Sequence, residues 1–304
     1  MRDVSETAYL VSLCRALETE KPNALFQDPF ARSLAGGKGE LQKRVLGDIR
    51  AIANAIAVRT YVIDEIIGQL IQNKGIDTVL NLGAGLDTRP YRLKLPPSLR
   101  WIEVDLPGIL SDKEQKLEQE YPRCDLKRVK LDLGDLNART RLFTKINAEA
   151  KRVLILSEGI LGYLTEKQVA DLAMDLYRQP NFGGWIFDLS AQSLLEQLQH
   201  RQTQKIFRQY FTNGKAAFSF APANGTEFFR PYGWQLAQFR STWEETRRLK
   251  RANRCAGVQE LLIRWFAKES WQEFRQKSGI ALLTRAPFDL NKINESLDRQ
   301  NEST

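Results

Sequence analysis

Between residues 78 and 93 the chain reads Thr78-Val-Leu-Asn-Leu-Gly-Ala-Gly-Leu-Asp-Thr-Arg-Pro-Tyr-Arg-Leu93, an apolar run that leads directly into Gly83-Ala84-Gly85. A buried parallel strand that ends in two glycines brings its backbone close to a ligand, where a side chain would be in the way. Asp105, twenty residues after Gly85, ends a second strand-like run, Trp101-Ile-Glu-Val-Asp105. Such an acid can accept hydrogen bonds from both ribose hydroxyls, so the two features together predict a nucleoside-type cofactor site.

The residues after the glycine turn indicate which cofactor this site takes. A dinucleotide fingerprint has a third glycine three residues after the second. This chain has Thr88 there, preceded by Asp87. A carboxylate beside the turn would repel a pyrophosphate and attract a ligand with an amino group and a sulfonium. The sequence therefore favours S-adenosylmethionine over NAD.

Composition is typical of a soluble globular protein. The 304 residues, 42% hydrophobic and 27% charged, suffice for one large α/β domain with additions or for two small domains. No apolar run approaches the roughly 20 residues of a membrane span, and the N-terminus lacks the apolar core of a signal peptide. Cys14, Cys124 and Cys255 are few and far apart, with neither a disulfide framework nor zinc spacing. We expect a cytoplasmic protein with no membrane partner.

The charge balance is basic, with a formal net charge of +8. The excess is dispersed, apart from one modest cluster between Arg247 and Arg254. Lysines and arginines on solvated helix faces explain such a pattern more simply than nucleic-acid binding does. An anionic substrate or product is favoured as a partner over DNA or RNA. The loop after the fourth predicted strand, Ser157-Glu-Gly-Ile-Leu-Gly-Tyr163, also differs from the Asp/Asn-Pro-Pro-Tyr loop of nucleic-acid amino-methylating enzymes.

The order of periodic segments predicts an α/β fold, a parallel sheet with helices on both faces. Strands are expected at 78–82, 101–104, 127–131, 153–157, 185–189, 233–239 and 279–284, and helices at 5–20, 41–71, 107–120, 165–178 and 191–211, with a break at 36–39. We divide this single domain into an N-terminal helical cap (1–75), a cofactor-binding core (76–190), an insertion or lid (191–232), C-terminal strands and helices (233–290) and a polar tail (291–304).

Ligands of an open parallel sheet bind outside the carboxyl ends of its strands. The polar residues expected there are Gly83, Gly85 and Asp87 after strand one, Asp105 after strand two, Asp132 after strand three and Glu158 after strand four. Asp132 would lie beside the adenine and accept from its exocyclic amine. Glu158 follows four apolar residues, so we expect it to be partly buried and paired. It either forms a structural salt bridge or meets the positive end of the cofactor, directly or through an arginine.

Three further residues are candidates for ligand contact. Arg15 and Arg59 lie on otherwise apolar helices, and either could clamp the methionine carboxylate or lie at the edge of the core. His200, the single histidine, is far from every motif, which argues against a histidine metal site, a serine–histidine triad or a histidine base. A carboxylate acceptor would need no base, because it is already ionised at neutral pH and needs only alignment. Tyr163 either orients that acceptor or simply packs.

Several blocks resemble the leucine carboxyl methyltransferase family and its bacterial relatives, which include natural-product methyltransferases. The resemblance runs from about residue 5 to 285. It rests on Thr7-Ala8, Cys14-Arg15-Ala16, Asp28-Pro29-Phe30-Ala31, Asn81 to Arg89, Arg92-Leu93, Glu103-Val-Asp-Leu-Pro107, Asp132-Leu133, Ser157-Glu158-Gly159, Tyr163-Leu164 and Phe229 to Trp234.

The resemblance implies a Rossmann-like class I methyltransferase fold with a seven-stranded sheet whose last strand is antiparallel, and S-adenosylmethionine as cofactor. The contacts it implies are Arg15, Arg59, Gly83, Asp105, Asp132, Leu133 and Glu158. The family reaction is methyl transfer to oxygen, often of a carboxylate. We therefore expect an O-methyltransferase that acts on a carboxylate or hydroxyl of a small metabolite; the alternatives are a protein C-terminal carboxyl methyltransferase and a non-catalytic S-adenosylmethionine-binding protein.

The acceptor is not indicated by any motif. Phenylalanines are frequent between Phe211 and Phe229, which suggests an apolar or aromatic acceptor, but these rings could equally pack the insertion onto the sheet. The sequence gives no indication of the oligomeric state.

Overall fold

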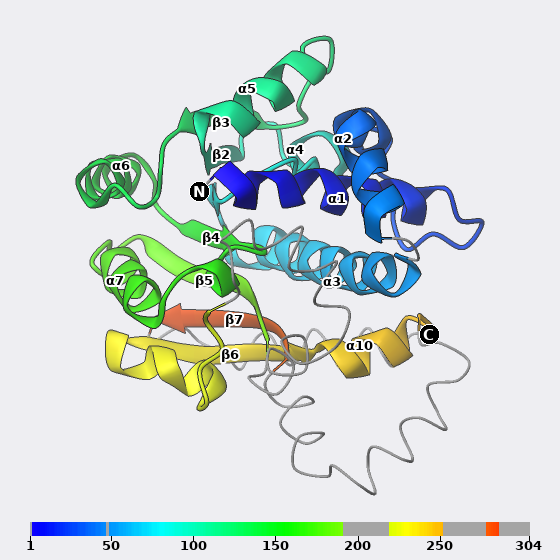
Figure 1. Cartoon of the computed structure of the whole chain (residues 1–304). Coiled ribbons are helices and arrows are strands. Elements are labelled where there is room, and N and C mark those ends of the chain that lie inside the picture. Colours follow the sequence, from blue (N-terminus) through cyan, green and yellow to red (C-terminus); the bar gives the residue numbers. More distant parts are fainter. Residues whose placement is uncertain (1, 47–48, 191–218, 252–277, 286–304) are drawn as a thin grey trace, which may run out of the picture.

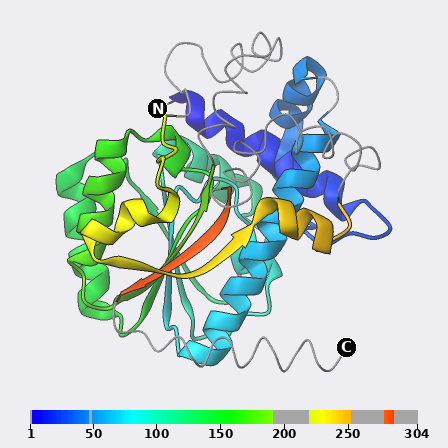
Figure 2. The ribbon, with the colours of Figure 1, turned by 90° about the horizontal axis from the view of Figure 1, so that it is seen from below.

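A computed structural model of the chain describes residues 2–46, 49–190, 219–251 and 278–285, which build a central sheet with helices on both faces (Figures 1 and 2). The strand order is β3-β2-β1-β4-β5-β7-β6. The strands are β1 (Thr78–Leu82), β2 (Arg100–Asp105), β3 (Asp125–Lys130), β4 (Val153–Ser157), β5 (Phe182–Leu189), β6 (Trp234–Ser241) and β7 (Gly279–Arg285). Strands β1 to β5 are parallel, and β7 is antiparallel to both β5 and β6. The predicted seven-stranded sheet with an antiparallel last strand is confirmed.

The described helices are α1 (Arg2–Thr19), α2 (Ala31–Leu46), α3 (Arg50–Lys74), α4 (Arg89–Arg92), α5 (Pro107–Lys116), α6 (Leu136–Glu149), α7 (Glu166–Tyr177) and α10 (Thr242–Arg248), with short 3₁₀ helices η1 (Leu161–Tyr163) and η2 (Gly225–Tyr232). Helices α5 and α7 begin and end close to the ranges predicted at 107–120 and 165–178. Thr165 opens α7 through a reciprocal capping box with Gln168. Asp135 caps α6 by accepting from the N–H of Ala138 at 3.0 Å.

Each face of the sheet buries its own apolar core. On one face α6 and α7 pack against side chains such as Trp185, which is fully buried. On the other, α3 contributes Val62, Ile66 and Leu70 against Trp101. Strands β1 and β4 are buried along their whole length, which explains their continuous apolar sequences. The edge strand β3 is rich in charged residues, and its residues are partly or fully exposed. Its first and last residues are therefore defined by its pairing with β2 and not by an apolar pattern.

The break predicted at 36–39 is confirmed at Gly36, where the backbone (φ 51°, ψ −156°) kinks α2 between two helical segments. The single helix predicted over 41–71 is wrong, because α2 ends at Leu46 and α3 begins at Arg50. The helix continues through Gly39 because α2 packs closely on α1. A Cβ at Gly39 would lie 3.0 Å from the carbonyl oxygen of Tyr9, so glycine permits an approach that outweighs its poor helix propensity.

Part of the predicted insertion is described, and its aromatic rings belong to the core. The ring of Phe229 is fully buried and lies 5.2 Å from Trp185 and 4.8 Å from Phe187, centroid to centroid. Phe220 and Phe228 join the same cluster. For these three phenylalanines the packing interpretation is correct. Other parts of the chain lie outside the described residues: Phe211, Phe218, the helix predicted at 191–211, most of 242–277 and the tail 291–304.

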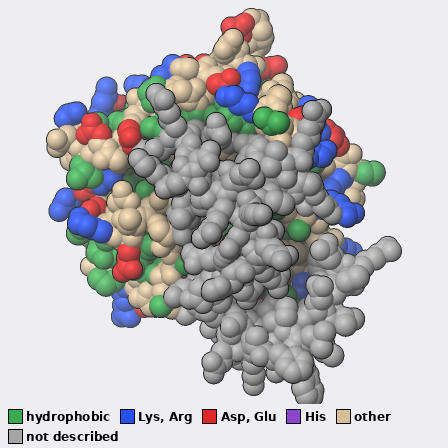
Figure 3. Space-filling view, in the orientation of Figure 1, with side chains coloured by type: hydrophobic (Ala, Val, Ile, Leu, Met, Phe, Trp, Pro, Cys, Tyr) green, Lys and Arg blue, Asp and Glu red, His purple; other side chains and the backbone are tan. Residues whose placement is uncertain are grey.

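The surface agrees with a dispersed charge. On the face shown in Figure 3, lysines and arginines are interspersed with acidic side chains over the described residues. Within the same part of the chain, no helix combines the length and the apolar character needed to cross a membrane.

Candidate functional site

A cavity of about 480 Å³ lies at the carboxyl ends of the parallel strands, within the usual size range of small-molecule sites. Its lining comes from α1, α3, α6, α7, the ends of β1 and β2, and the loops after β1, β2, β3 and β4. Nine of the residues predicted from the sequence line it: Arg15, Arg59, Gly83, Gly85, Asp87, Asp105, Leu133, Glu158 and Tyr163. Asp132 is not among the lining residues.

The glycine turn after β1 has the backbone conformation that glycine alone adopts easily. Gly83 has φ +67° and Gly85 φ +45°. A Cβ at Gly83 would lie 2.7 Å from Cδ1 of Ile160, in the loop after β4. The space beside Gly83 is thus filled by the protein itself, which fixes the loop after β1 against the loop after β4. The same residue still lines the cavity.

Asp105 connects the tip of β2 to this turn. Its Oδ2 accepts from the backbone N–H of Gly85 at 2.6 Å, and its Oδ1 accepts from that of Leu106 at 2.7 Å. Burial raises the pKa of Asp105, and the two N–H groups partly oppose that effect. A carboxylate offers about four acceptor positions, so about two remain for a ligand. The structure brings together the glycine turn and the acid that the spacing had linked.

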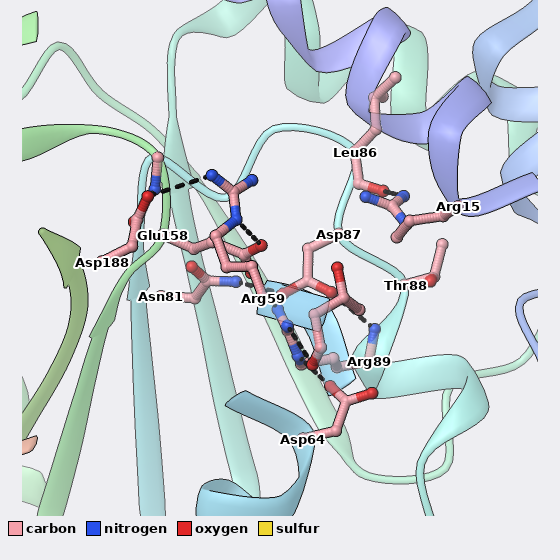
Figure 4. Close-up of polar contacts among 12 residues, drawn as sticks. Arg15, Arg59, Asp64, Asn81, Leu86, Asp87, Thr88, Arg89, Glu158 and Asp188 are labelled. Atoms are coloured by element: carbon pink, nitrogen blue, oxygen red, sulfur yellow. Dashed lines mark hydrogen bonds and ion pairs between the residues drawn. The ribbon is translucent and has the colours of Figure 1, made fainter. Parts of the chain in front are cut away.

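Arg89 is the centre of the charged part of the site (Figure 4). Its side chain is 2% exposed, and its guanidinium contacts three carboxylates: Asp64 at 2.6 Å, Asp87 at 2.8 Å and Glu158 at 2.7 Å. Burial alone would raise the pKa of Asp87 and Glu158, but the guanidinium of Arg89 holds both below their usual range. Both carboxylates are therefore ionised at neutral pH.

Asp87 is held in place by more than this ion pair. Its Oδ2 also accepts from the side-chain amide of Asn81 at 2.9 Å, and its Oδ1 accepts from the backbone N–H of Arg89 at 2.9 Å. The carboxylate lines the cavity in a fixed orientation. We had placed Asp87 in the site but had given Arg89 no role, although it follows two residues later in the same motif.

Arg59 reaches the site from α3. Its Nε donates to Glu158 at 2.9 Å and its Nη1 to Asp188 at 3.1 Å. Glu158 therefore lies between Arg59 and Arg89, which shows that it is paired. Both sequence interpretations include such an ion pair, because Arg59 and Glu158 also line the cavity. Asp188, in β5, was missed. The signal was present, because an acid near the end of the apolar run Trp185-Ile-Phe-Asp-Leu189 repeats the pattern that identified Glu158.

Arg15 fastens α1 to the glycine loop. Its Nε pairs with Asp28 at 2.8 Å, and its Nη2 donates to the carbonyl oxygen of Leu86 at 2.6 Å. Asp28 also accepts from the hydroxyl of Thr88 at 2.7 Å. The Arg15 side chain is 8% exposed, against 21% for Arg59. Of the two arginines, Arg59 is more open to a ligand.

The loop after β3 separates two neighbours that the sequence had placed together. Leu133 lines the cavity, whereas the exposed Asp132 turns back and accepts from the N–H of Gly134 at 2.8 Å. Such an Asx-type turn satisfies the carboxylate locally, which explains its position outside the lining. Tyr163 does line the cavity, and burial raises the pKa of its hydroxyl, although a hydrogen bond with Thr7 lowers it. It is protonated at neutral pH.

His200, to which the sequence assigns no role in the site, lies beyond the described residues. Within the residues that the structure places, no group of three His, Cys, Asp or Glu side chains could hold a metal ion.

Comparison with known proteins identifies the family. The sequence model of leucine carboxyl methyltransferases matches residues 8–176. A protein of Parafrankia sp. (strain EAN1pec), named provisionally as an S-adenosyl-L-methionine-dependent methyltransferase, is 32% identical over 205 residues, which cover 64% of this chain and 66% of that protein. A protein of Streptomyces avermitilis with the same provisional description is 34% identical over 173 residues, 54% of this chain and 60% of that protein. The chain thus spans about 60 to 66% of the length of these curated relatives.

The fold has a counterpart among solved structures. A DUF574 family protein from Streptomyces avermitilis superposes with a TM-score of 0.56 at 14% identity, over 92% of this chain and 97% of the other, which shows a shared fold. With the strand order, this likeness confirms the predicted Rossmann-like α/β fold with a seven-stranded sheet. The family match and the relatives confirm S-adenosylmethionine as the cofactor. The chain belongs to the leucine carboxyl methyltransferase family.

Proposed function

We propose that this protein is an S-adenosylmethionine-dependent O-methyltransferase that acts on a carboxylate or hydroxyl of a small organic metabolite. One observation carries the proposal: the cavity joins a carboxylate with free acceptor positions, Asp105, to two ionised carboxylates, Asp87 and Glu158, that are held by arginines. This set matches a ligand that has ribose hydroxyls at one end and an ammonium and a sulfonium at the other.

The lining residues suggest how each part of the cofactor is held. Asp105 would accept from the ribose hydroxyls, and Asp87 from the ammonium group. The side chain of Leu133 would pack on the adenine, a role that we assign to this residue rather than to Asp132 because only Leu133 lines the cavity. Arg59 would pair with the methionine carboxylate, because its guanidinium is the more exposed of the two candidates.

The protonation states of the lining residues bear on the acceptor. When bound, S-adenosylmethionine supplies an activated methyl group, to which the acceptor oxygen bonds while the carbon–sulfur bond breaks and its electron pair goes to the sulfur. Asp87 and Glu158 are poor proton acceptors, since the pKa of each is lowered by Arg89. Tyr163 keeps its proton and could donate a hydrogen bond to an acceptor oxygen. These properties favour an acceptor that arrives already ionised, which a carboxylic acid does at neutral pH.

Binding of the cofactor is the first test. Calorimetric titration of S-adenosylmethionine into the purified protein should give micromolar affinity, with NAD as a control that does not bind. Folded protein that fails to bind S-adenosylmethionine would contradict the proposal.

The second test identifies the acceptor chemistry. Protein supplied with methyl-tritiated S-adenosylmethionine is incubated with panels of carboxylic acids, of phenols and alcohols, and of peptides with a free C-terminal carboxylate. A methyl ester releases labelled methanol in mild alkali, whereas a methyl ether does not, so the product class is read directly. Labelling of the peptides alone would favour a protein substrate, and labelling of nothing while the cofactor binds would favour a non-catalytic role.

A further inference from the structure

Asp188 contributes to the site without lining the cavity. It belongs to β5 and its side chain is 25% exposed. Its two carboxylate oxygens have different partners: Oδ2 pairs with Nη1 of Arg59 at 3.1 Å, and Oδ1 accepts from the backbone N–H of Gly159 at 2.6 Å. One carboxylate therefore connects an arginine of α3 with the turn that follows β4 (Figure 4).

The guanidinium of Arg59 is held from two sides and open on a third. Nε is bound by Glu158 and Nη1 by Asp188, whereas Nη2 makes no hydrogen bond with any described residue. The planar guanidinium presents its donors in a rigid fork, so fixing two nitrogens also fixes the direction of the third. Arg59 lines the cavity, which makes Nη2 the donor available to a ligand there.

Glu158 and Asp188 are not equivalent partners. Glu158 divides its charge between Arg59 and Arg89, because its other oxygen pairs with Arg89 at 2.7 Å. Asp188 pairs with no other cation among the described residues. Its link to Gly159 also fixes the turn beside Arg59, where a Cβ on Gly159 would lie 3.4 Å from Nη1 of Arg59. Asp188 is therefore the carboxylate dedicated to the orientation of Arg59.

We infer that Asp188 is a positioning residue that aims Nη2 of Arg59 at the carboxylate of the amino-acid part of the cofactor, and so sets the preference of the site for a carboxylate-bearing ligand. This inference rests on the proposed function, in which Arg59 meets that carboxylate. Loss of the Asp188 charge would release the guanidinium from one of its two fixed contacts.

The test compares two ligands that differ only in that group. S-adenosylmethionine and its decarboxylated analogue share the adenosine, the sulfonium and the amine. For the unaltered protein we expect tighter binding of the carboxylate form. In Asp188→Asn, which keeps the shape and removes the charge, the affinity for S-adenosylmethionine should fall about tenfold, as expected for a lost charged contact, while that for the analogue stays within about twofold. Asp188→Glu should restore part of the preference.

Two further variants separate positioning from a general structural effect. In Arg59→Lys the preference for the carboxylate form should fall, and adding Asp188→Asn to it should change the preference no further. Glu245→Gln is the matched control, because Glu245 also pairs with two arginines, Arg240 and Arg248, but does not line the cavity. It should leave the ratio of the two affinities unaltered.

The possible failures are distinct. If the unaltered, folded protein binds neither ligand, the proposed function itself is wrong. If the unaltered protein binds and Asp188→Asn lowers both affinities by the same factor, or neither, Asp188 has only a structural role and the inference is overturned. An effect of Asp188→Asn that persists in full on the Arg59→Lys background would also overturn it.

Discussion

The cavity has two walls of opposite character. The charged wall consists of Arg59, Asn81, Asp87 and Glu158, and the apolar wall of Leu131, Leu133, Leu164 and Leu172. The hydrogen bonds that hold the charged wall in place join residues far apart in the chain. Arg89 and Glu158 are 69 positions apart, Arg59 and Glu158 are 99 apart, and Arg59 and Asp188 are 129 apart. The apolar wall comes from two segments, the loop after β3 and the segment after β4, and takes no residue from the N-terminal helices. The charged wall therefore depends on the docked N-terminal helices, and the apolar wall does not.

This difference has an energetic consequence. A buried ion pair adds little net stability when complete, but removal of one partner leaves an uncompensated charge and is strongly destabilising. A side chain of the apolar wall that is only partly buried, such as Leu133, loses mainly contact area when it is shortened, whereas the fully buried Leu172 also belongs to the core. Substitutions in the charged wall should therefore affect both folding and binding, whereas a substitution at Leu133 should affect mainly binding.

The largest effect is expected for Arg89→Met. It leaves three carboxylates, Asp64, Asp87 and Glu158, without their shared cation, so the free energy of unfolding should fall by about 3–5 kcal/mol in urea titration. The control is Arg100→Met, whose partner Glu149 is 45% exposed and whose loss should cost less than about 1 kcal/mol. Equal losses in the two variants would show that the charged wall has no special dependence on Arg89.

The next largest effect is expected for Asp105→Ala, which tests the proposed ribose acceptor. The substitution removes the acceptor proposed for the ribose, so affinity for S-adenosylmethionine should fall about 100-fold by calorimetry. Asp132→Ala is a matched control, since that carboxylate accepts from Gly134 in its own turn and lies outside the cavity lining; it should change affinity by less than about threefold. A loss in Asp132→Ala as large as that in Asp105→Ala would restore Asp132 as the residue that reads the adenine.

The charged wall should also show a characteristic response to acid. The folded-state pKa values of Asp87 and Glu158 are lowered. Their contribution to stability is therefore complete above the unfolded-state values, near pH 4, and is lost as the pH falls through the lower folded values, at about 1.4 kcal/mol for each unit of pKa lowering. Melting temperature measured against pH should be flat near neutrality and decline below about pH 4.

The variant Glu158→Gln sharpens that measurement. It removes one of the two titrating groups from the wall, so the acid-induced decline should be shallower than in the unaltered protein. An unchanged slope would mean that Glu158 does not contribute to the loss of stability in acid.

Features of the fold and the site that depend on local sequence were predictable, whereas those that depend on contacts between distant residues were not. Strands β1 and β4 were predicted to the residue, because an apolar run bounded by polar residues determines a buried strand. The search for polar residues at the strand ends identified Asp87, Asp105 and Glu158, which line the cavity, because a parallel sheet brings the carboxyl ends of its strands to one edge.

Other features were not predictable in this way. No local pattern shows that Arg89 joins Asp64 of α3 to Glu158 after β4, because these contacts exist only once the helices dock. The path of α2 through its glycines likewise depends on the packing of Gly39 against Tyr9 in α1. The direction of Asp132 is set by a choice between a donor in its own turn, the N–H of Gly134, and a donor on a ligand, which sequence spacing does not determine.

The smallest expected effect comes from the apolar wall. Leu133 is partly buried at the edge of the main core, and Leu133→Ala would remove contact with the adenine while leaving the charged wall intact. The loss of roughly 1 kcal/mol of apolar contact should weaken binding about fivefold, and by the same factor for S-adenosylmethionine and its decarboxylated analogue, because both carry the same adenosine. Substitutions around Arg59 should instead change the ratio of the two affinities. If Leu133→Ala also changed that ratio, the two walls would not act on separate ends of the ligand, and the assignment of adenine to the apolar wall would be wrong.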